Sequence, residues 1–353
     1  MRSSTTARLR AVSVVVLLVF LCAPALAQLA PAPERVYRVA VPLAEPEVEL
    51  KQLREMELDL HTFDIKSGQA YLFVTETQLD ELERLGFQPQ ILEDATPDRE
   101  STEALSDYLD EQESAEAVDR IANDYPSIAQ KIEYADPSHE GRTITGLKIS
   151  DNVGAEEAEP TILYVSQHHA REVMTPEVII DFADELTQQY GIDEEVTRWV
   201  DENEIYLFPC HNPDGTNYVF NVNSNWRKNR RDNGDGSFGV DPNRNYPFQW
   251  NGCGGSSGTP SSDTYRGPSP GSEPITQGLM EITEDVRPAI SLTYHTYGEY
   301  VLHPFGCDPA LPDDPDRRAH RDIGSTLAMQ VETDSGTGYY RMGTPPELLY
   351  GVD

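Results

Sequence analysis

The stretch Thr161-Ile-Leu-Tyr-Val-Ser-Gln167 runs directly into His168-His-Ala-Arg-Glu172, and this passage decides the fold. A short run rich in branched and aromatic residues that ends in a polar cluster is typical of a buried strand. Residues 204–209 (EIYLFP) and 289–294 (AISLTY) repeat the pattern. Because helix-like segments separate these strands, we expect one α/β domain with a mixed, largely parallel central sheet and helices on both faces.

The other elements of this domain follow from periodicity and from residues that begin or end helices. Thr175-Pro176 is typical of a helix start, with threonine as the N-cap and proline at the first helical position. We expect a further strand at 143–149 and helices at 114–125, 175–190, 272–286 and 319–332.

Polar side chains follow the strands where ligands bind in open α/β sheets, just beyond the carboxyl ends. His169 and Glu172, separated by two residues, follow the first strand, and His295 follows the third. Two imidazoles and one carboxylate form a catalytic zinc set that leaves a fourth position for water. A His-x-x-Glu pair alone is also a common chance pattern, so the rest of the chain has to decide.

Six motifs in a fixed order decide in favour of the metal site. They are His169-Ala-Arg-Glu-Val-Met-Thr-Pro176, Asn212-Pro-Asp-Gly215, Trp226-Arg-Lys228, Asp241-Pro-Asn-Arg-Asn245, Thr264-Tyr-Arg-Gly267 and His295-Thr-Tyr297. Together they resemble the zinc metallocarboxypeptidase family over about residues 106–353. The resemblance implies one zinc ion bound by His169, Glu172 and His295.

The same resemblance implies roles for four further residues. Arg227 matches the arginine that polarises the scissile carbonyl, and Asn243 and Arg244 match the pair that binds the substrate's C-terminal carboxylate. Tyr350 matches the mobile tyrosine that closes over the substrate. Arginine suits these roles because its planar guanidinium is always charged and binds a carboxylate through two hydrogen bonds.

Neighbouring polar residues have simpler interpretations. We expect His168 and His211 to be structural or hydrogen-bonding residues near the site, and Asp241 to contact a ligand histidine. Arg230 and Arg231 are expected to form a solvated basic loop.

A second metal is a weaker hypothesis. Asp232-Asn-Gly-Asp-Gly236 resembles part of an oxygen-ligand calcium loop. It lacks the length and the closing glutamate of an EF-hand, so a polar turn remains the alternative interpretation.

The region ahead of the α/β domain divides into three parts. Residues 1–27 have a basic start, an apolar stretch and Ala25-Leu-Ala27, the features of a secretory signal peptide. Residues 28–95 follow a strand-helix-strand-strand-helix-strand order, which predicts a small α+β ferredoxin-like domain resembling the family's activation propeptide. Residues 96–105 are expected to be an exposed acidic linker, and 106–353 the catalytic domain. We therefore expect a secreted zymogen, extracellular or periplasmic.

The charge balance limits the partners. The formal net charge is −34, with 27 basic and 61 acidic residues. Nucleic acids and anionic membranes need a cationic surface, so neither is expected as a partner. We expect a monomer that acts on peptides or proteins with a free C-terminus. The acid excess indicates a salty habitat, or simply an acidic exported protein.

The number of cysteines fits an exported protein only loosely. Cys210 follows an apolar run and is expected to be a buried thiol, whereas a Cys253–Cys307 disulfide is one of the pairings open to the exported chain.

Two alternatives to a carboxypeptidase remain open at this point, a murein peptidase and an inactive domain that binds peptide ends. The resemblance also implies a glutamate general base beyond the matched tyrosine, and the sequence ends at Asp353 before that position. We therefore expect this chain to keep the metal and carboxylate sites but to have little peptidase activity.

Overall fold

The computed structural model describes residues 35–56, 58–64, 67–96, 105–252, 255–306 and 312–348. The predicted signal peptide, most of the linker, Cys253, Cys307 and Tyr350 lie outside the described residues. In the described part of the chain, no helix is long and apolar enough to span a bilayer.

The N-terminal region forms the expected small α+β domain. Its elements are β1 (Val36–Pro42), α1 (Pro46–Glu55), β2 (Asp59–Asp64), β3 (Gln69–Thr75), α2 (Glu76–Arg84) and β4 (Gln90–Asp94). The four strands pair antiparallel in the order β2-β3-β1-β4. Alternate residues of β3 are buried, and Leu72 and Val74 pack with Leu53 of α1 and Leu82 of α2 in one apolar core. The predicted ferredoxin-like order is confirmed.

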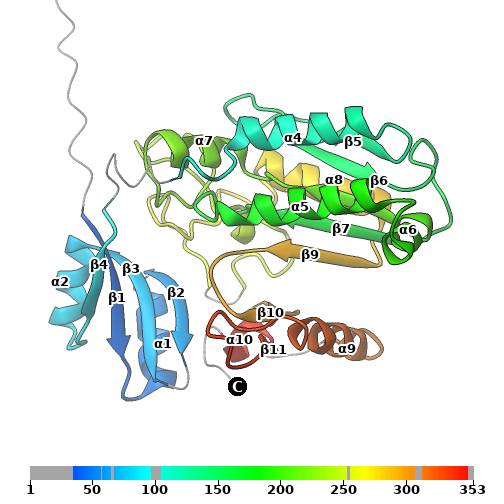
Figure 1. Ribbon diagram of the computed structural model, residues 1–353. Coiled ribbons are helices and arrows are strands. Elements are labelled where there is room, and N and C mark those ends of the chain that lie inside the picture. Colours follow the sequence, from blue (N-terminus) through cyan, green and yellow to red (C-terminus); the bar gives the residue numbers. More distant parts are fainter. Residues whose placement is uncertain are drawn as a thin grey trace, which may run out of the picture. The chain divides into compact units, whose positions relative to one another are not determined.

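The second part of the chain is built on a five-stranded sheet (Figure 1). Its strands are β5 (Ala129–Glu133), β6 (Thr145–Ile149), β7 (Thr161–Ser166), β8 (Glu204–Phe208) and β9 (Ile290–Tyr294). The order is β5-β6-β8-β7-β9, with parallel pairing at β8-β7 and β7-β9 and antiparallel pairing at β5-β6 and β6-β8. The expected mixed sheet is therefore confirmed.

Helices cover both faces of this sheet because its central strands, β6, β8 and β7, bury residues on both sides. On one face lie α4 (Glu111–Asp124), α5 (Met174–Gln189) and α6 (Glu194–Asp201), and their apolar residues pack against Leu147, Ile149, Ile205 and Leu207. On the other face, α8 (Pro274–Val286) packs Ile275 and Leu279 against Leu163, Val165 and Phe208 (Figure 1).

The C-terminal described residues form a smaller group of elements. The strands β10 (Tyr300–Leu302) and β11 (Arg341–Gly343) pair in parallel. They accompany α9 (Asp316–Ala328) and the short α10 (Pro345–Leu348).

The prediction for the start of α5 was wrong. The N-cap position is Val173, without a side-chain hydrogen bond, and Thr175 is already inside the helix. The Thr175 hydroxyl instead accepts from the backbone N–H of Gln167 (3.2 Å) and donates to the carbonyl of Glu172 (2.8 Å). This threonine therefore braces the loop between β7 and α5.

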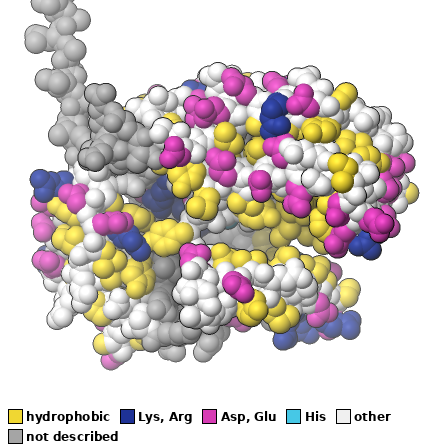
Figure 2. Space-filling model, viewed as in Figure 1, with side chains coloured by type: hydrophobic (Ala, Val, Ile, Leu, Met, Phe, Trp, Pro, Cys, Tyr) yellow, Lys and Arg dark blue, Asp and Glu magenta, His cyan; other side chains and the backbone are white. Residues whose placement is uncertain are grey.

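The surface reflects the composition. Figure 2 shows aspartate and glutamate side chains scattered over the visible face of the α/β domain, with few basic side chains among them. Such a surface repels polyanions and is self-repulsive in dilute buffer.

Candidate metal centre and carboxylate site

The parallel pairing of β7 and β9 brings the predicted metal ligands together. Val165 pairs with Thr293 and Ser166 with Tyr294, so the two strands end side by side. His169 follows β7 and His295 follows β9 directly. Parallel strands present their carboxyl ends at one edge of a sheet, which is why residues so far apart in sequence meet here.

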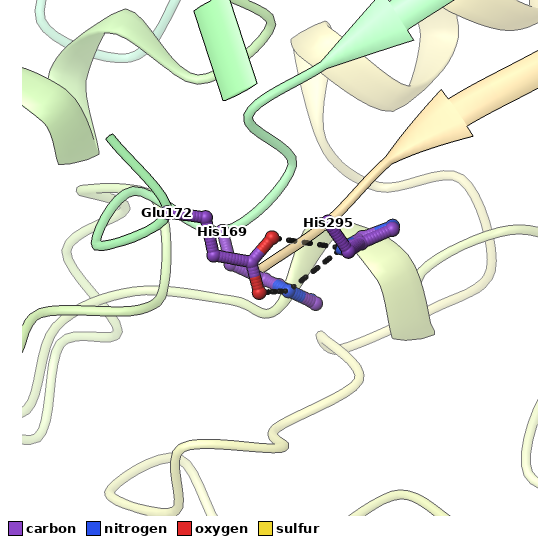
Figure 3. Close-up of side chains that lie close together, drawn as sticks. All are labelled: His169, Glu172 and His295. Atoms are coloured by element: carbon purple, nitrogen blue, oxygen red, sulfur yellow. Dashed lines mark hydrogen bonds and ion pairs between the residues drawn. The ribbon is translucent and has the colours of Figure 1, made fainter. Parts of the chain in front are cut away.

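Three donor groups converge at this edge (Figure 3). Nδ1 of His169 lies 2.7 Å from Oε1 of Glu172, and Nδ1 of His295 lies 2.9 Å from Oε2. The two Nδ1 atoms are 3.2 Å apart. His169 and Glu172 are buried, whereas the side chain of His295 is 31% exposed. The cluster is thus fixed on one side and accessible on the other.

The separation of the two imidazole donors fits a tetrahedral zinc ion. Zinc–nitrogen bonds of about 2.0–2.1 Å imply donor separations of about 3.3 Å around a tetrahedron. The observed separation of the Nδ1 atoms of His169 and His295 is 3.2 Å. Two imidazoles and one carboxylate also match the donor chemistry that zinc prefers.

Asp241 connects the metal ligands to Arg227. Its Oδ1 lies 3.3 Å from Nε2 of His169, a contact without hydrogen-bond geometry. Its Oδ2 accepts from Nε (3.1 Å) and a terminal nitrogen (2.9 Å) of Arg227. Burial raises the pKa of Asp241, but the charges of Arg227 and His169 outweigh burial and hold the pKa well below its usual range. The buried carboxylate is therefore ionised and orients both Arg227 and His169.

Asn243 and Arg244 lie in a short 3-10 helix, Pro242–Arg244, that Asp241 caps. The backbone N–H of Asn243 donates to Oδ1 of Asp241 (2.9 Å), and that of Arg244 donates to its carbonyl (3.0 Å). Nε of Arg244 donates to the carbonyl of Gly255 (2.6 Å). The charge of Arg244 also lowers the pKa of Asp241. A single aspartate thus links the candidate carboxylate-binding residues to the metal ligands.

His168 and His211 form the hydrogen-bonding layer expected behind the metal ligands. Nε2 of His168 contacts the hydroxyl of Tyr246 (2.8 Å), and Nδ1 of His211 contacts the hydroxyl of Tyr134 (3.0 Å). Their rings lie 4.4 Å apart. Burial lowers the pKa of both, that of His211 to about 3, so both imidazoles are neutral. Neither belongs to the converging donor group.

The prediction of a solvated basic loop was wrong for Arg230. Its guanidinium carbon lies 3.8 Å from the ring centre of Tyr218 and 4.7 Å from those of Trp226 and Phe238. Its side chain is 12% exposed. Arg231 is partly exposed and pairs with the buried Glu273 at 3.2 Å. Both arginines are therefore structural partners of the loop that carries Arg227.

The segment Asp232–Gly236 forms a turn held by its own side chains. Oδ1 of Asp232 accepts from the N–H of Gly234 (2.8 Å), and Oδ1 of Asp235 accepts from the N–H of Ser237 (2.9 Å). Both glycines of the turn, Gly234 and Gly236, have positive φ. These features favour the polar-turn interpretation, and calcium binding stays an untested prediction.

Sequence reasoning missed Tyr246 and Glu273. Tyr246 binds His168, and Glu273 is fully buried among four hydrogen-bond donors. The one available signal was position, since Tyr246 follows the Asp241–Asn245 motif directly and Glu273 precedes the proline that begins α8.

An α/β sheet that gathers two histidines and a glutamate at the carboxyl ends of parallel strands defines a zinc-binding domain of the hydrolase type. Residues 115–352 match the family model described as zinc carboxypeptidase, Peptidase_M14. The chain belongs to this zinc carboxypeptidase family, and His169, Glu172 and His295 provide the site for the one Zn²⁺ that membership implies.

Similar proteins support the same assignment. Metallocarboxypeptidase A of Trichophyton rubrum is 35% identical over 230 residues, which cover 63% of this chain and 54% of that protein. Carboxypeptidase B of Astacus astacus is 34% identical over 251 residues, 69% of this chain and 78% of the relative. This chain thus spans about half the length of the Trichophyton relatives it matches.

Solved structures share the fold. The carboxypeptidase A of Helicoverpa armigera superposes with a TM-score of 0.78 at 22% identity, covering 92% of this chain and 84% of that one. Thrombin-activatable fibrinolysis inhibitor superposes with a TM-score of 0.71 at 20% identity, covering 90% and 85%. At these identities the likeness supports the architecture alone.

Proposed function

We propose that this protein is a secreted zinc-dependent carboxypeptidase that removes residues from free C-termini of peptides. The observation that carries the proposal is the Asp241 junction. One buried carboxylate contacts the metal ligand His169, binds Arg227 and caps the helix of Asn243 and Arg244. A metal centre and cationic groups are thereby linked in one rigid unit.

The substrate's terminal carboxylate is the group that Asn243 and Arg244 recognise in this proposal. A guanidinium and an amide give charge-assisted hydrogen bonds to a carboxylate oxygen pair. An exopeptidase needs such a fixed cation because it must distinguish the last residue from internal ones. Acidic residues outnumber basic ones by 61 to 27, so a fixed cation here runs against the overall charge of the chain.

Arg227 stabilises negative charge that develops on the scissile carbonyl oxygen. Asp241 holds its guanidinium in place before the substrate arrives, and a preorganised cation costs no reorganisation during reaction. When bound, the zinc ion supplies a Lewis acid that polarises a carbonyl and lowers the pKa of a coordinated water. Tyr350 is proposed, on the resemblance alone, to close over the bound substrate.

Paired peptides test the substrate proposal. The zinc-loaded protein is incubated with N-blocked peptides that end in a free carboxylate and with the same peptides as C-terminal amides. We expect release of the terminal residue from the free acids and little turnover of the amides, because the amides lack the ionic partner of Arg244. Equal turnover of both would contradict a carboxypeptidase and favour an endopeptidase or a murein peptidase.

Metal analysis tests the ligands separately from activity. His295→Ala should lose most of its zinc affinity, whereas the control His320→Ala, on α9, should bind zinc like the wild type. Equal zinc content in the two variants would contradict the assignment.

We further propose that residues 28–95 are a removable pro-segment, supported by their separate α+β fold and by the acidic stretch that follows. Limited proteolysis should cut first between about Glu93 and Leu105. A first cut within residues 106–353 would contradict this proposal. Export is proposed from the signal-like pattern of residues 1–27. The expectation that the chain has little activity finds no support in the comparisons, and the peptide assay decides it.

A further inference from the structure

We propose that Glu273 is a positioning residue for carboxylate recognition, because it joins the loop that carries Arg227 to the loop that carries Arg244. Glu273 directly precedes α8 and is 0% exposed. The inference rests on the proposed function, since it concerns the same carboxylate site.

The side chain of Glu273 is fully engaged. Oε1 accepts from the hydroxyl of Ser272 (2.6 Å) and from Arg231 (3.2 Å). Oε2 contacts Nε2 of His139 (2.7 Å) and accepts from Nδ2 of Asn229 (2.7 Å). Burial raises the pKa of Glu273, but the hydrogen bonds from His139, Ser272 and Asn229 outweigh it and hold the pKa below its usual value. A buried carboxylate with this many donors is a rigid junction.

The first loop depends on Glu273 through Asn229, which lies two residues after Arg227. Oδ1 of Asn229 accepts from the N–H of Val240 (2.7 Å), and its own N–H donates to the carbonyl of Val240 (3.0 Å). Val240 precedes Asp241, the partner of Arg227. By holding the side-chain amide of Asn229, Glu273 therefore fixes the backbone next to Arg227 and the backbone next to its partner Asp241.

The second loop depends on the backbone of Glu273. Its N–H donates to Oδ1 of Asn245 (3.1 Å), the residue that follows Arg244. Nδ2 of Asn245 donates to the carbonyls of Arg266 (2.9 Å) and Ser269 (3.1 Å). Asn245 is 0% exposed. One residue thus holds the two loops at a fixed separation, by its side chain on one side and its backbone on the other.

This separation matters because one bound substrate contacts both loops in the proposed function: its terminal carboxylate meets Asn243 and Arg244, and its scissile carbonyl oxygen meets Arg227. Binding sites need their groups held to about 0.5 Å by residues behind them. Loosening the junction should weaken recognition of the negative charge while leaving the metal ligands in place. The hydrogen-bond partners of the Glu273 carboxylate are His139, Asn229, Arg231 and Ser272, and none of them is a metal ligand.

The test compares binding of an acid and its amide that contain no peptide bond. Probes are 3-phenylpropionate and 4-methylpentanoate against the corresponding primary amides, titrated by calorimetry into the zinc-loaded full chain. The variant is Glu273→Gln, which keeps the shape but removes the charge and leaves the two donors at one of the carboxylate positions without an acceptor. The matched control is Glu281→Gln, an exposed glutamate on the same helix.

We expect the wild type and the control to bind the acid more tightly than the amide. In Glu273→Gln the ratio of the two Kd values should fall by about tenfold, because a hydrogen bond to a charged group contributes at least the corresponding free energy. Zinc stoichiometry should be unchanged. A full preference in Glu273→Gln would overturn the inference and leave the proposed function intact. A wild type without preference would overturn the carboxylate site itself. If Glu273→Gln does not fold, Arg231→Gln is tested instead. This substitution removes one hydrogen-bond partner of Glu273 and should be tolerated because Arg231 is partly exposed. An undiminished acid preference in Arg231→Gln would overturn the inference.

Discussion

Replacing Asp241 by asparagine is the most informative single change in this protein. The substitution keeps the size of the side chain and removes its charge. Arg227 is 8% exposed and loses the carboxylate that receives two of its hydrogen bonds. Removing one partner of a buried ion pair costs about 3–5 kcal/mol. The carboxylate that faces Nε2 of His169 is lost as well.

Two quantities follow from these contacts. Loss of a carboxylate behind a metal-binding histidine typically lowers metal affinity by about 10–100-fold. A loss of about 3–5 kcal/mol corresponds to a fall in Tm of about 6–20 °C for a domain of this size. We therefore expect the Asp241→Asn variant to have both a lower zinc affinity and a lower Tm than the wild type.

The assay is competition with a fluorescent zinc chelator, combined with thermal unfolding of the metal-free protein. Asp232→Asn is the control because it removes one charge from an exposed aspartate in the same region. If Asp241→Asn matched the wild type in zinc affinity and Tm while retaining its fold, the proposed coupling of Arg227 to the metal centre through Asp241 would be refuted.

Four further predictions concern the rest of the molecule. Asp241 and Glu273 have lowered pKa values in the folded chain. The stability that they contribute is therefore present above about pH 4 and is lost as the pH falls through the folded pKa values. Near-ultraviolet circular dichroism should show unfolding on acidification below about pH 4, and an unchanged signal there would contradict this. Burial raises the pKa of Cys210 to about 12, so mass mapping after brief alkylation at neutral pH should find this thiol unmodified, and rapid labelling would be evidence against its burial. Gly278→Ala should lower the free energy of unfolding by about 1–3 kcal/mol, because the new Cβ would lie 2.4 Å from the ring of Tyr134. Urea titrations measure this change, and unchanged stability would mean that the ring of Tyr134 moves aside freely. The acid excess predicts that Tm rises from dilute buffer to molar salt, and a flat or falling curve would reject adaptation to salt.

The sequence was most informative where one physical effect dominates. The strands β7 and β8 are largely buried and β9 is partly exposed, but all three read as short runs rich in apolar residues, so their existence and the polar clusters at their ends could be predicted. The ligands His169, Glu172 and His295 were expected because parallel strands present their ends together and because six motifs resemble the zinc metallocarboxypeptidase family.

Elements with a weaker pattern were missed. The edge strand β5 has the sequence AQKIE, and its polar residues hide the alternation. The helix α7 (Pro213–Asn221) begins with Asn-Pro-Asp-Gly, which is typical of a turn; the side chain of Asn212 caps the N–H of Gly215 (3.2 Å) and converts that turn into a helix start.

Tertiary contacts were beyond reach. The three rings around Arg230 come from positions 218, 226 and 238, and no local pattern indicates that they meet. The same holds for Glu273, whose partners come from residues 139, 229 and 231 as well as from the adjacent Ser272. Charged residues that become buried look like surface residues until the fold is known.

The position of β9 has a consequence for how the protein folds in time. In the strand order of the described sheet β9 comes last, and it pairs there with β7. His169 and Glu172 are neighbours on one loop, whereas His295 reaches them across 126 and 123 residues. Because contacts so far apart in sequence form slowly, we expect His169 and Glu172 to come together before His295 reaches them. Cobalt added during refolding would then bind in two phases, and its visible spectrum would time the docking of β9 onto the sheet.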